Sequence, residues 1–308
     1  MIATMPKEQF TATAAALIRS ALGGVTEVTA LRVIQEDKDY AVLALTLSNP
    51  EREIVVKLAG PHARLACPFD RTAAIVGLIR SRTAAPTFEV LAFDVSYRVC
   101  PWRYMVMSSV PGANWLERRP GQARAHGAAL GRTVGQLHTL RFPSCGEVGT
   151  DGHPIEGTTY FAALLVRVRR RIVNTEHASL IISLLQERVE LFAGLDTGAL
   201  CHEDLNPYNL LVDDTYSERP IVSVVDFDSA WAGCPESDLA RLELWRGMVG
   251  EGFWEAYRAV APLSPRYAER RPLYQLLWCL EYARPTREHL EDTAAICAEL
   301  GIAPVTFS

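Results

Sequence analysis

The fold of this chain is decided by two stretches, Cys201-His202-Glu203-Asp204-Leu205-Asn206-Pro207-Tyr208-Asn209-Leu210-Leu211-Val212 and Val224-Val225-Asp226-Phe227-Asp228. The first reads His-x-Asp-x-x-x-x-Asn followed by an apolar run, and the second is an apolar run that ends in an acidic residue. The four residues between Asp204 and Asn209 predict a tight loop that directs both side chains into one cleft. Asp226 then approaches the same point from the next loop.

These residue types suit phosphoryl transfer, which needs placed charges more than covalent chemistry from the protein. In this interpretation Asp204 orients or deprotonates the attacking hydroxyl, and His202 braces the loop. Asn209 and Asp226 bind Mg²⁺ against the phosphates, and Asp228 is a further candidate carboxylate. Each of these residues alone is more typical of a turn between strands, because Asp and Asn favour turns. Their combination favours a site for phosphoryl transfer over a set of turn residues.

The composition is that of a globular protein, with 308 residues, a net charge of -5, 49% hydrophobic and 22% charged residues. At roughly 150 residues per domain, the length predicts about two domains. No stretch approaches the ~18 consecutive apolar residues of a membrane span. Lys7 and Glu8 precede only a short apolar helix that Arg19 interrupts, so we expect no signal peptide. A membrane protein and a secreted mini-scaffold are therefore excluded.

The cysteines and the charge distribution narrow the class further. The seven cysteines are an odd number without a C-x-x-C pair, which predicts free thiols in a reducing compartment, here the cytoplasm, rather than a disulfide framework or zinc module. Residues 201–308 carry a net charge of -9 and residues 1–200 a net charge of +4. An acidic C-terminal third repels nucleic acid and attracts cations. Neither a nucleic-acid nor a membrane partner is expected.

The pattern of apolar residues predicts an α+β fold of two parts, 1–108 and 109–308. The first part begins with a helix at 10–21, which an antiparallel meander of three strands follows at 31–34, 41–47 and 54–58. A helix at 70–81 and two more strands at 88–93 and 104–108 complete this part. Beyond Pro111-Gly112 the chain is mostly helical, with helices predicted at 123–140, 160–171, 178–192, 235–245, 252–260, 272–282 and 288–300. A strand pair at 210–212 and 221–226 interrupts them.

Three other features favour ordinary structural roles. The basic run 167–171 is interpreted as a solvated helix face, with phosphate or nucleic-acid binding as the alternative. Gly127, Gly131 and Gly135 predict close packing of helices in a soluble protein. The histidines outside the catalytic loop lack ligand-type spacing and are taken as structural or surface residues: His62, His126, His138, His153, His177 and His289.

The decisive stretches resemble the aminoglycoside phosphotransferase family, the small-molecule branch of the protein-kinase-like fold. His202, Asp204 and Asn209 match its His-Gly-Asp-x-x-x-x-Asn motif, and Asp226 matches its metal-binding aspartate. Weaker matches extend over most of the chain, at 104–112, 129–138, Gly233 and 238–240. The resemblance implies a two-lobed protein-kinase-like fold, with a small antiparallel-sheet N-terminal lobe that binds nucleotide and a larger, mostly helical C-terminal lobe for catalysis and substrate.

The resemblance also implies how ATP or GTP binds. Lys57, in the strand 54–58, occupies the position of the lysine that holds the α- and β-phosphates, and backbone around Ser108, Ser109 and Val110 would contact adenine. A lysine that snorkels from a strand end is the alternative interpretation.

The chain departs from the family's pattern at three places. Glu203 replaces a glycine. Thr72 aligns with the glutamate that normally pairs with the lysine, so that Asp70 is a nearby substitute. The phosphate-covering loop, expected at 35–39, has no glycine.

The resemblance implies an ATP- and Mg²⁺-dependent O-phosphotransferase that acts on a small-molecule hydroxyl. The acidic C-terminal third favours a cationic acceptor, and residues 104–115 and 225–227 are most similar to hygromycin-type kinases. The favoured acceptor is thus an antibiotic, an aminoglycoside or a tuberactinomycin, whose phosphorylation confers resistance. Macrolide, choline, homoserine and sugar kinases of the same fold stay open, as do a nucleotide-binding pseudo-enzyme and a kinase of proteins. The sequence does not predict an oligomeric state.

Overall fold

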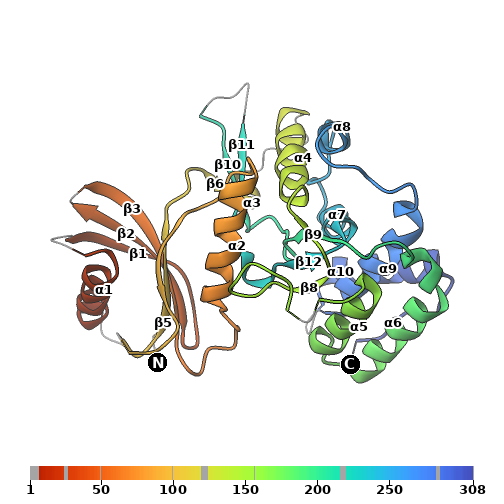
Figure 1. Cartoon of the computed structure of the whole chain (residues 1–308), viewed down its shortest axis with the longest axis horizontal. Coiled ribbons are helices and arrows are strands. Elements are labelled where there is room, and N and C mark those ends of the chain that lie inside the picture. Colours follow the sequence, from red (N-terminus) through yellow and green to blue (C-terminus); the bar gives the residue numbers. More distant parts are fainter. Residues whose placement is uncertain are drawn as a thin grey trace.

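A computed structural model describes residues 7–23, 27–48, 50–98, 100–118, 124–155, 157–215, 220–281 and 285–307. A small sheet with two helices lies at one end of the molecule, and a larger, mostly helical part lies at the other (Figure 1). This is the predicted α+β, protein-kinase-like arrangement of two lobes. In the part described, no helix is long and apolar enough to cross a bilayer.

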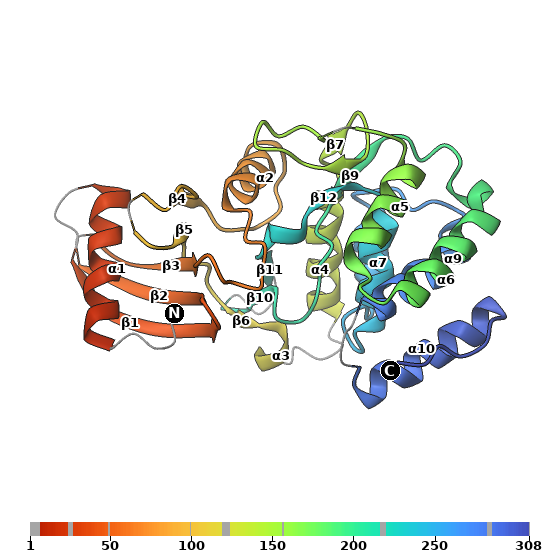
Figure 2. The ribbon, with the colours of Figure 1, turned by 90° about the horizontal axis from the view of Figure 1, so that it is seen from below.

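The N-terminal lobe is a five-stranded antiparallel sheet of order β1-β2-β3-β5-β4. Its strands are β1 (Val28–Asp37), β2 (Tyr40–Ser48), β3 (Glu51–Ala59), β4 (Val90–Asp94) and β5 (Arg103–Ser108). Helix α1 (Lys7–Leu22) covers one face and buries Leu17 and Ile18 there, while α2 (Phe69–Arg82) lies toward the other lobe (Figure 2). The antiparallel meander and the helix at 70–81 are confirmed.

The loop predicted at 35–39 is shorter than expected, and its phosphate-covering role stays a prediction. Strand β1 continues to Asp37, which pairs with Tyr40 of β2, so only Lys38 and Asp39 form the turn. Asp39 adopts the left-handed conformation (φ 60°), which aspartate tolerates in two-residue hairpin turns. Its carboxylate accepts the His62 N–H at 2.9 Å, which fixes the turn against the end of β3.

The C-terminal lobe is built from eight helices in the described residues: α3 (Trp115–Arg118), α4 (Arg124–His138), α5 (Tyr160–Arg171), α6 (Thr175–Glu187), α7 (Pro235–Leu244), α8 (Phe253–Arg258), α9 (Tyr267–Leu280) and α10 (Arg287–Leu300). Most predicted helices are confirmed, although 123 and 282 lie outside the described residues. The single helix predicted at 178–192 is wrong, because Arg188 leaves helical geometry (φ -122°, ψ 28°) and a 3-10 turn follows at Val189–Phe192. Helix α9 begins before the predicted start at 272, with Pro272 inside it.

The predicted close packing of Gly127, Gly131 and Gly135 is confirmed. Added side chains at Gly127 and Gly131 would meet the backbone carbonyls of Glu251 and Phe253, at and just before the start of α8. Glycine is therefore required where α4 crosses this segment.

Two short sheets carry the loops of the site. One has the order β11-β10-β6, from β11 (Ile221–Val224), β10 (Leu210–Asp213) and β6 (Ala113–Asn114). The other, which the sequence did not predict, has the order β7-β9-β12-β8 from β7 (Arg141–Phe142), β9 (Gly198–Cys201), β12 (Trp231–Gly233) and β8 (Gly146–Glu147). The loop between β9 and β10 holds the first decisive stretch, and the turn between β11 and β12 holds the second.

Candidate active site

Asp204 and Asn209 lie in direct contact, as their spacing predicted. The Asn209 side-chain amide donates to the backbone carbonyl of Asp204 at 2.9 Å and to its Oδ2 at 3.0 Å. Arg241 of α7 donates to the other carboxylate oxygen, Oδ1, at 2.5 Å. The Asp204 side chain is still 37% exposed, so it is fixed from both sides and accessible to a substrate.

His202 joins the catalytic loop to the strand that leads to Asp226. Its Nε2 lies 2.9 Å from the carbonyl oxygen of Val225, and its Nδ1 lies 3.1 Å from the backbone N–H of Asp204. The Asp204 N–H can only donate, so Nδ1 accepts and Nε2 carries the proton. This tautomer connects the two decisive stretches through one buried ring.

Asp238 in α7 holds the backbone of the same loop, which the sequence did not predict. Its carboxylate accepts the N–H of His202 at 2.7 Å and the N–H of Glu203 at 2.8 Å, and His138 lies 3.2 Å away. Burial would raise the pKa of Asp238, but the hydrogen bond from His138 and the neighbouring donors outweigh burial and lower this pKa. The ionised carboxylate therefore fixes the loop at neutral pH.

Lys57 points from β3 toward the metal loop. Its Nζ lies 2.6 Å from Asp226 Oδ1 and 3.2 Å from Asp228 Oδ2, and the side chain is only 7% exposed. Thr72 of α2 donates to the other oxygen of Asp228 at 2.8 Å. Asp70, the substitute partner considered from the sequence, instead accepts the N–H of Arg71 at its own helix start. Asp228, which Thr72 holds in place, is thus the second carboxylate that forms an ion pair with Lys57.

The charges of this cluster are strongly coupled. Burial would lower the pKa of Lys57, but the carboxylates of Asp228 and Asp226 outweigh burial and raise it. Burial would raise the pKa of Asp226, but Lys57 outweighs burial and lowers it. Both groups are therefore ionised at neutral pH.

The predicted magnesium ligands fit a magnesium ion. Because the Asn209 Nδ2 atom is committed to Asp204, its amide oxygen is the atom left for a cation. The ionised carboxylate of Asp226 is the second hard oxygen donor. Mg²⁺ in phosphotransfer sites typically takes one or two protein oxygens and completes its shell with phosphates and water. The donor set is therefore sufficient.

The residues predicted to contact adenine lie at the end of β5, where Ser108 is the last residue of the strand and Ser109 and Val110 follow it. The Ser108 N–H donates to the Glu89 carbonyl at 2.9 Å, and its hydroxyl accepts the Glu89 N–H at 2.9 Å. The Ser109 hydroxyl donates to Glu53 at 2.8 Å. The Ser108 N–H is thus already used within the protein, and contact of adenine with the backbone around Ser108, Ser109 and Val110 stays a prediction.

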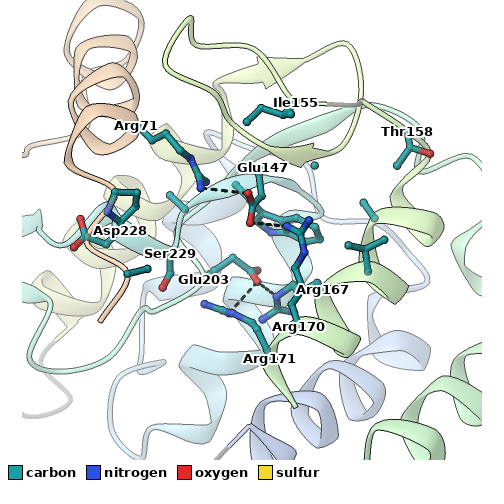
Figure 3. A pocket seen from close by; sticks show the side chains of 17 residues that line it. Arg71, Glu147, Ile155, Thr158, Arg167, Arg170, Arg171, Glu203, Asp228 and Ser229 are labelled. Atoms are coloured by element: carbon teal, nitrogen blue, oxygen red, sulfur yellow. Dashed lines mark hydrogen bonds and ion pairs between the residues drawn. The ribbon is translucent and has the colours of Figure 1, made fainter. Parts of the chain in front are cut away.

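Two adjoining cavities border the catalytic loop. One, of about 560 Å³, is lined by Asp204 together with Arg171, Glu203, Asn206, Tyr208, Ser229, Arg241, Trp245, Trp278 and Glu281. The other, of about 330 Å³, lies between the start of α2, β8, α5 and β12 and shares Arg171, Glu203 and Ser229 with the first (Figure 3). Both volumes lie in the range of small-molecule sites. The cavity beside Asp204 is the natural place for an acceptor.

The basic run on α5 is a solvated helix face only in part, because Arg169 and Arg170 are exposed whereas Arg167 is buried. Arg167 is 7% exposed, and Arg167, Arg170 and Arg171 all line the smaller cavity (Figure 3). A signal was available, because Arg167 and Arg171 fall on the same helical stripe as Leu164 and Val168. Their acidic partners, distant in sequence, could not be found from that stripe.

A buried glutamate pairs with these arginines. Glu203, where the family has glycine, is 1% exposed in its side chain and lies 2.5 Å from Arg167 and 3.8 Å from Arg171. Glu281 lies 3.2 Å and 3.5 Å from the same two arginines. The guanidinium groups of Arg167 and Arg241 lie 4.4 Å and 4.1 Å from the ring centre of Trp278.

The fold and this site define the class of small-molecule kinases with a protein-kinase-like fold. Residues 31–273 match the model of the phosphotransferase enzyme family APH, and the chain belongs to that family. It is accordingly a phosphotransferase.

Solved structures of similar fold share little sequence with the chain. A putative fructosamine-3-kinase from Haemophilus somnus 129PT is 14% identical, with a TM-score of 0.65 over 93% of this chain and 96% of that one. The GDP and kanamycin complex of APH(2")-IIIa is 14% identical, with a TM-score of 0.62 over 96% and 99%. Spectinomycin phosphotransferase APH(9)-Ia, in complex with ADP and spectinomycin, is 14% identical, with a TM-score of 0.56 over 96% and 94%.

Proposed function

We propose that this protein transfers the γ-phosphate of ATP or GTP, with Mg²⁺, to a hydroxyl group of a small molecule. The observation that carries the proposal is a pair of contacts, Asp204 with Asn209 and Lys57 with Asp226, joined by the hydrogen bond of 3.0 Å from the Val225 N–H to the Asn209 carbonyl. Asp204 also lines the cavity of about 560 Å³. On this proposal residues 1–108 bind the nucleotide, residues 109–308 hold the catalytic loop and acceptor, and the enzyme works in the reducing cytoplasm, which its free cysteines support.

The residues divide the work as follows. Asp204 accepts the proton of the acceptor hydroxyl, and Arg241 with Asn209 holds its carboxylate in position for that transfer. Lys57 donates to the phosphates of the nucleotide, and His202 keeps the loop in register with Asp226. Asn209 and Asp226 would hold Mg²⁺, which supplies charge neutralisation at the phosphates when bound.

The test is release of ADP from ATP and Mg²⁺ across a panel of small alcohols, sugars, amino alcohols and antibiotics. Asp204→Asn keeps the size of the side chain and removes the base, so we expect a loss of about 10²–10⁴-fold in kcat. Glu255→Gln, which alters an exposed pair with Arg124, is the matched control and should keep full activity. Nucleotide binding without turnover on any acceptor would instead identify a pseudo-enzyme.

A cationic antibiotic is a second, narrower candidate for the acceptor. The structures that name kanamycin and spectinomycin as bound compounds favour it, as does the net charge of -9 on residues 201–308. Turnover of an aminoglycoside or a tuberactinomycin, together with raised resistance of cells that express the protein, would establish it. Turnover of metabolites alone would retain the kinase and remove the resistance role.

A further inference from the structure

The walls of the two cavities are rich in arginine. Five arginines line them, at Arg71, Arg167, Arg170, Arg171 and Arg241. Apart from Asp204 and Asp228, which belong to the proposed reaction machinery, the acidic lining residues are three glutamates: Glu147, Glu203 and Glu281. Over all lining residues the two kinds of group are equal in number, five each; with Asp204, Asp228 and Arg241, the partner of Asp204, set aside, four arginines remain against three glutamates.

Each of these glutamates already has arginine partners. Glu147 lies 3.3 Å from Arg71 and 2.9 Å from Arg170, and Figure 3 shows it between them. Glu203 and Glu281 both pair with Arg167 and Arg171. The ammonium group of a cationic acceptor would have to displace an arginine from one of these pairs.

The arginines of these pairs are preorganised and partly accessible, as is Glu147, whose side chain is 45% exposed. Arg171 lines both cavities with 28% of its side chain exposed, and Arg71 keeps 22% exposed. The guanidinium group of Arg171 lies 5.7 Å from the ring centre of Trp278, the indole that the guanidinium groups of Arg167 and Arg241 also contact. A guanidinium held on an aromatic face presents a fixed fork that suits carboxylate and phosphate oxygens.

From this wall we propose that the acceptor carries an anionic group, a carboxylate or a phosphate, in addition to the hydroxyl that is phosphorylated. Arg171 binds this group, with Arg71 and Arg170 at the far end of the smaller cavity, while the hydroxyl reaches Asp204. The inference rests on the proposed function for the identity of the site. It explains why Glu203 is buried beneath the arginines, where it fixes them and offsets part of their charge.

The first test is binding without nucleotide, followed by tryptophan fluorescence, because Trp231, Trp245 and Trp278 line the cavities. The probes are glycerol 3-phosphate, malonate and, as the cationic counterpart, 1,3-diaminopropane. We expect an anionic probe to bind at millimolar concentration and the diamine not to bind. Binding of glycerol 3-phosphate alone selects phosphate as the group, and binding of malonate alone selects carboxylate.

The variants are Arg171→Gln and, as the matched control, Arg169→Gln, an exposed arginine of the same helix that lines neither cavity. Loss of a charge-assisted pair predicts about 10- to 100-fold weaker anion binding for R171Q and no change for R169Q. Arg167 still pairs with both glutamates in R171Q, so the fold should persist, as circular dichroism would check.

Preferred binding of the diamine, equal anion binding by R171Q and wild type, or no anion binding at all would each overturn the inference. These outcomes are separate from failure of the proposed kinase, because binding is measured without turnover. ADP release is then measured with carbon skeletons compared as neutral, amine, carboxylate and phosphate forms. If phosphoryl transfer occurs but favours the amine forms, the kinase stands and the anionic acceptor is wrong.

Discussion

Replacement of Asp238 by asparagine should remove the support of the whole catalytic loop. The carboxylate of Asp238 is fully buried and accepts two backbone N–H groups, from His202 and Glu203, besides its contact with His138. Asparagine keeps one acceptor oxygen and turns an N–H₂ group toward at least one of these donors.

The size of the effect follows from those contacts. One charge-assisted hydrogen bond is lost, about 1.5–3 kcal/mol, and the two remaining contacts weaken from charged to neutral, about 1 kcal/mol each. We therefore expect D238N to lower the free energy of unfolding by about 3–5 kcal/mol, a large share of the total stability of a typical protein. Displacement of Asp204 by even about 1 Å should reduce kcat about 10²-fold.

The effect of pH gives a second readout. The pKa of Asp238 is lowered in the folded protein, so its contribution is present above the unfolded value of about 3.9 and is lost as pH falls through the folded value. The difference in stability between wild type and D238N should be constant above about pH 5 and should narrow below about pH 4.

Urea unfolding, followed by circular dichroism at several pH values, measures the loss of stability and its dependence on pH. ADP release at pH 7 measures the loss of kcat that follows from displacement of Asp204. Glu255→Gln, an exposed carboxylate, is the control and should stay within about 0.5 kcal/mol of wild type. A change below about 1 kcal/mol for D238N at pH 7, or a difference that does not vary with pH, would refute the role assigned to this carboxylate.

Three further predictions follow from contacts elsewhere. Thr72→Val removes the hydrogen bond to Asp228 without changing the side chain's shape, and should lower kcat/KM for ATP about 5- to 30-fold, whereas Asp70→Asn should leave it unchanged in the same ADP-release assay. Gly131→Ala places a methyl group against the Phe253 carbonyl and should lower the free energy of unfolding in urea by about 1–3 kcal/mol. Gly77→Ala in α2 meets no atom and should leave this free energy unchanged or raise it. Similar changes for both variants would contradict the packing of α4 on the start of α8. In native protein, iodoacetamide should label Cys100 first, because the other six cysteines are buried: Cys67, Cys145, Cys201, Cys234, Cys279 and Cys297. Burial also raises the pKa of the Cys67 thiol to about 12. Rapid native labelling of Cys201, detected by mass spectrometry, would refute this order.

The residues that the sequence identified best are those whose spacing is local. Asp204 and Asn209 are five positions apart, so a single tight loop determines their contact. Lys57 was identified from the resemblance, which implies a lysine on the third strand, and it is one of only three lysines in the chain. The first signal is carried by one segment, and the second needs only the order of the strands.

Partners supplied by distant segments were missed or assigned wrongly. Thr72 was considered only as the residue that replaces the glutamate partner of the lysine, and the three-dimensional arrangement shows that its hydroxyl donates to Asp228. Strand β9, four residues long, is too short to distinguish from a buried helical segment by pattern, and its pairing with β12 is made far along the chain. The net charge of -9 on residues 201–308 was a sum over positions, whereas the cavity wall depends on arginines of α5 that lie outside that range.

Glu203 shows how one residue connects the reaction with the acceptor site. Its backbone adopts φ 63°, which glycine would take without strain and which costs other residues about 1–2 kcal/mol. Its backbone N–H donates to the carboxylate of Asp238, and this contact does not involve the Glu203 side chain. The side chain contributes elsewhere, because its carboxylate is buried against Arg167 and Arg171 on α5. A strained glutamate in place of glycine therefore indicates that this loop, besides presenting Asp204, fixes Arg167 and Arg171, which face the acceptor in our proposal.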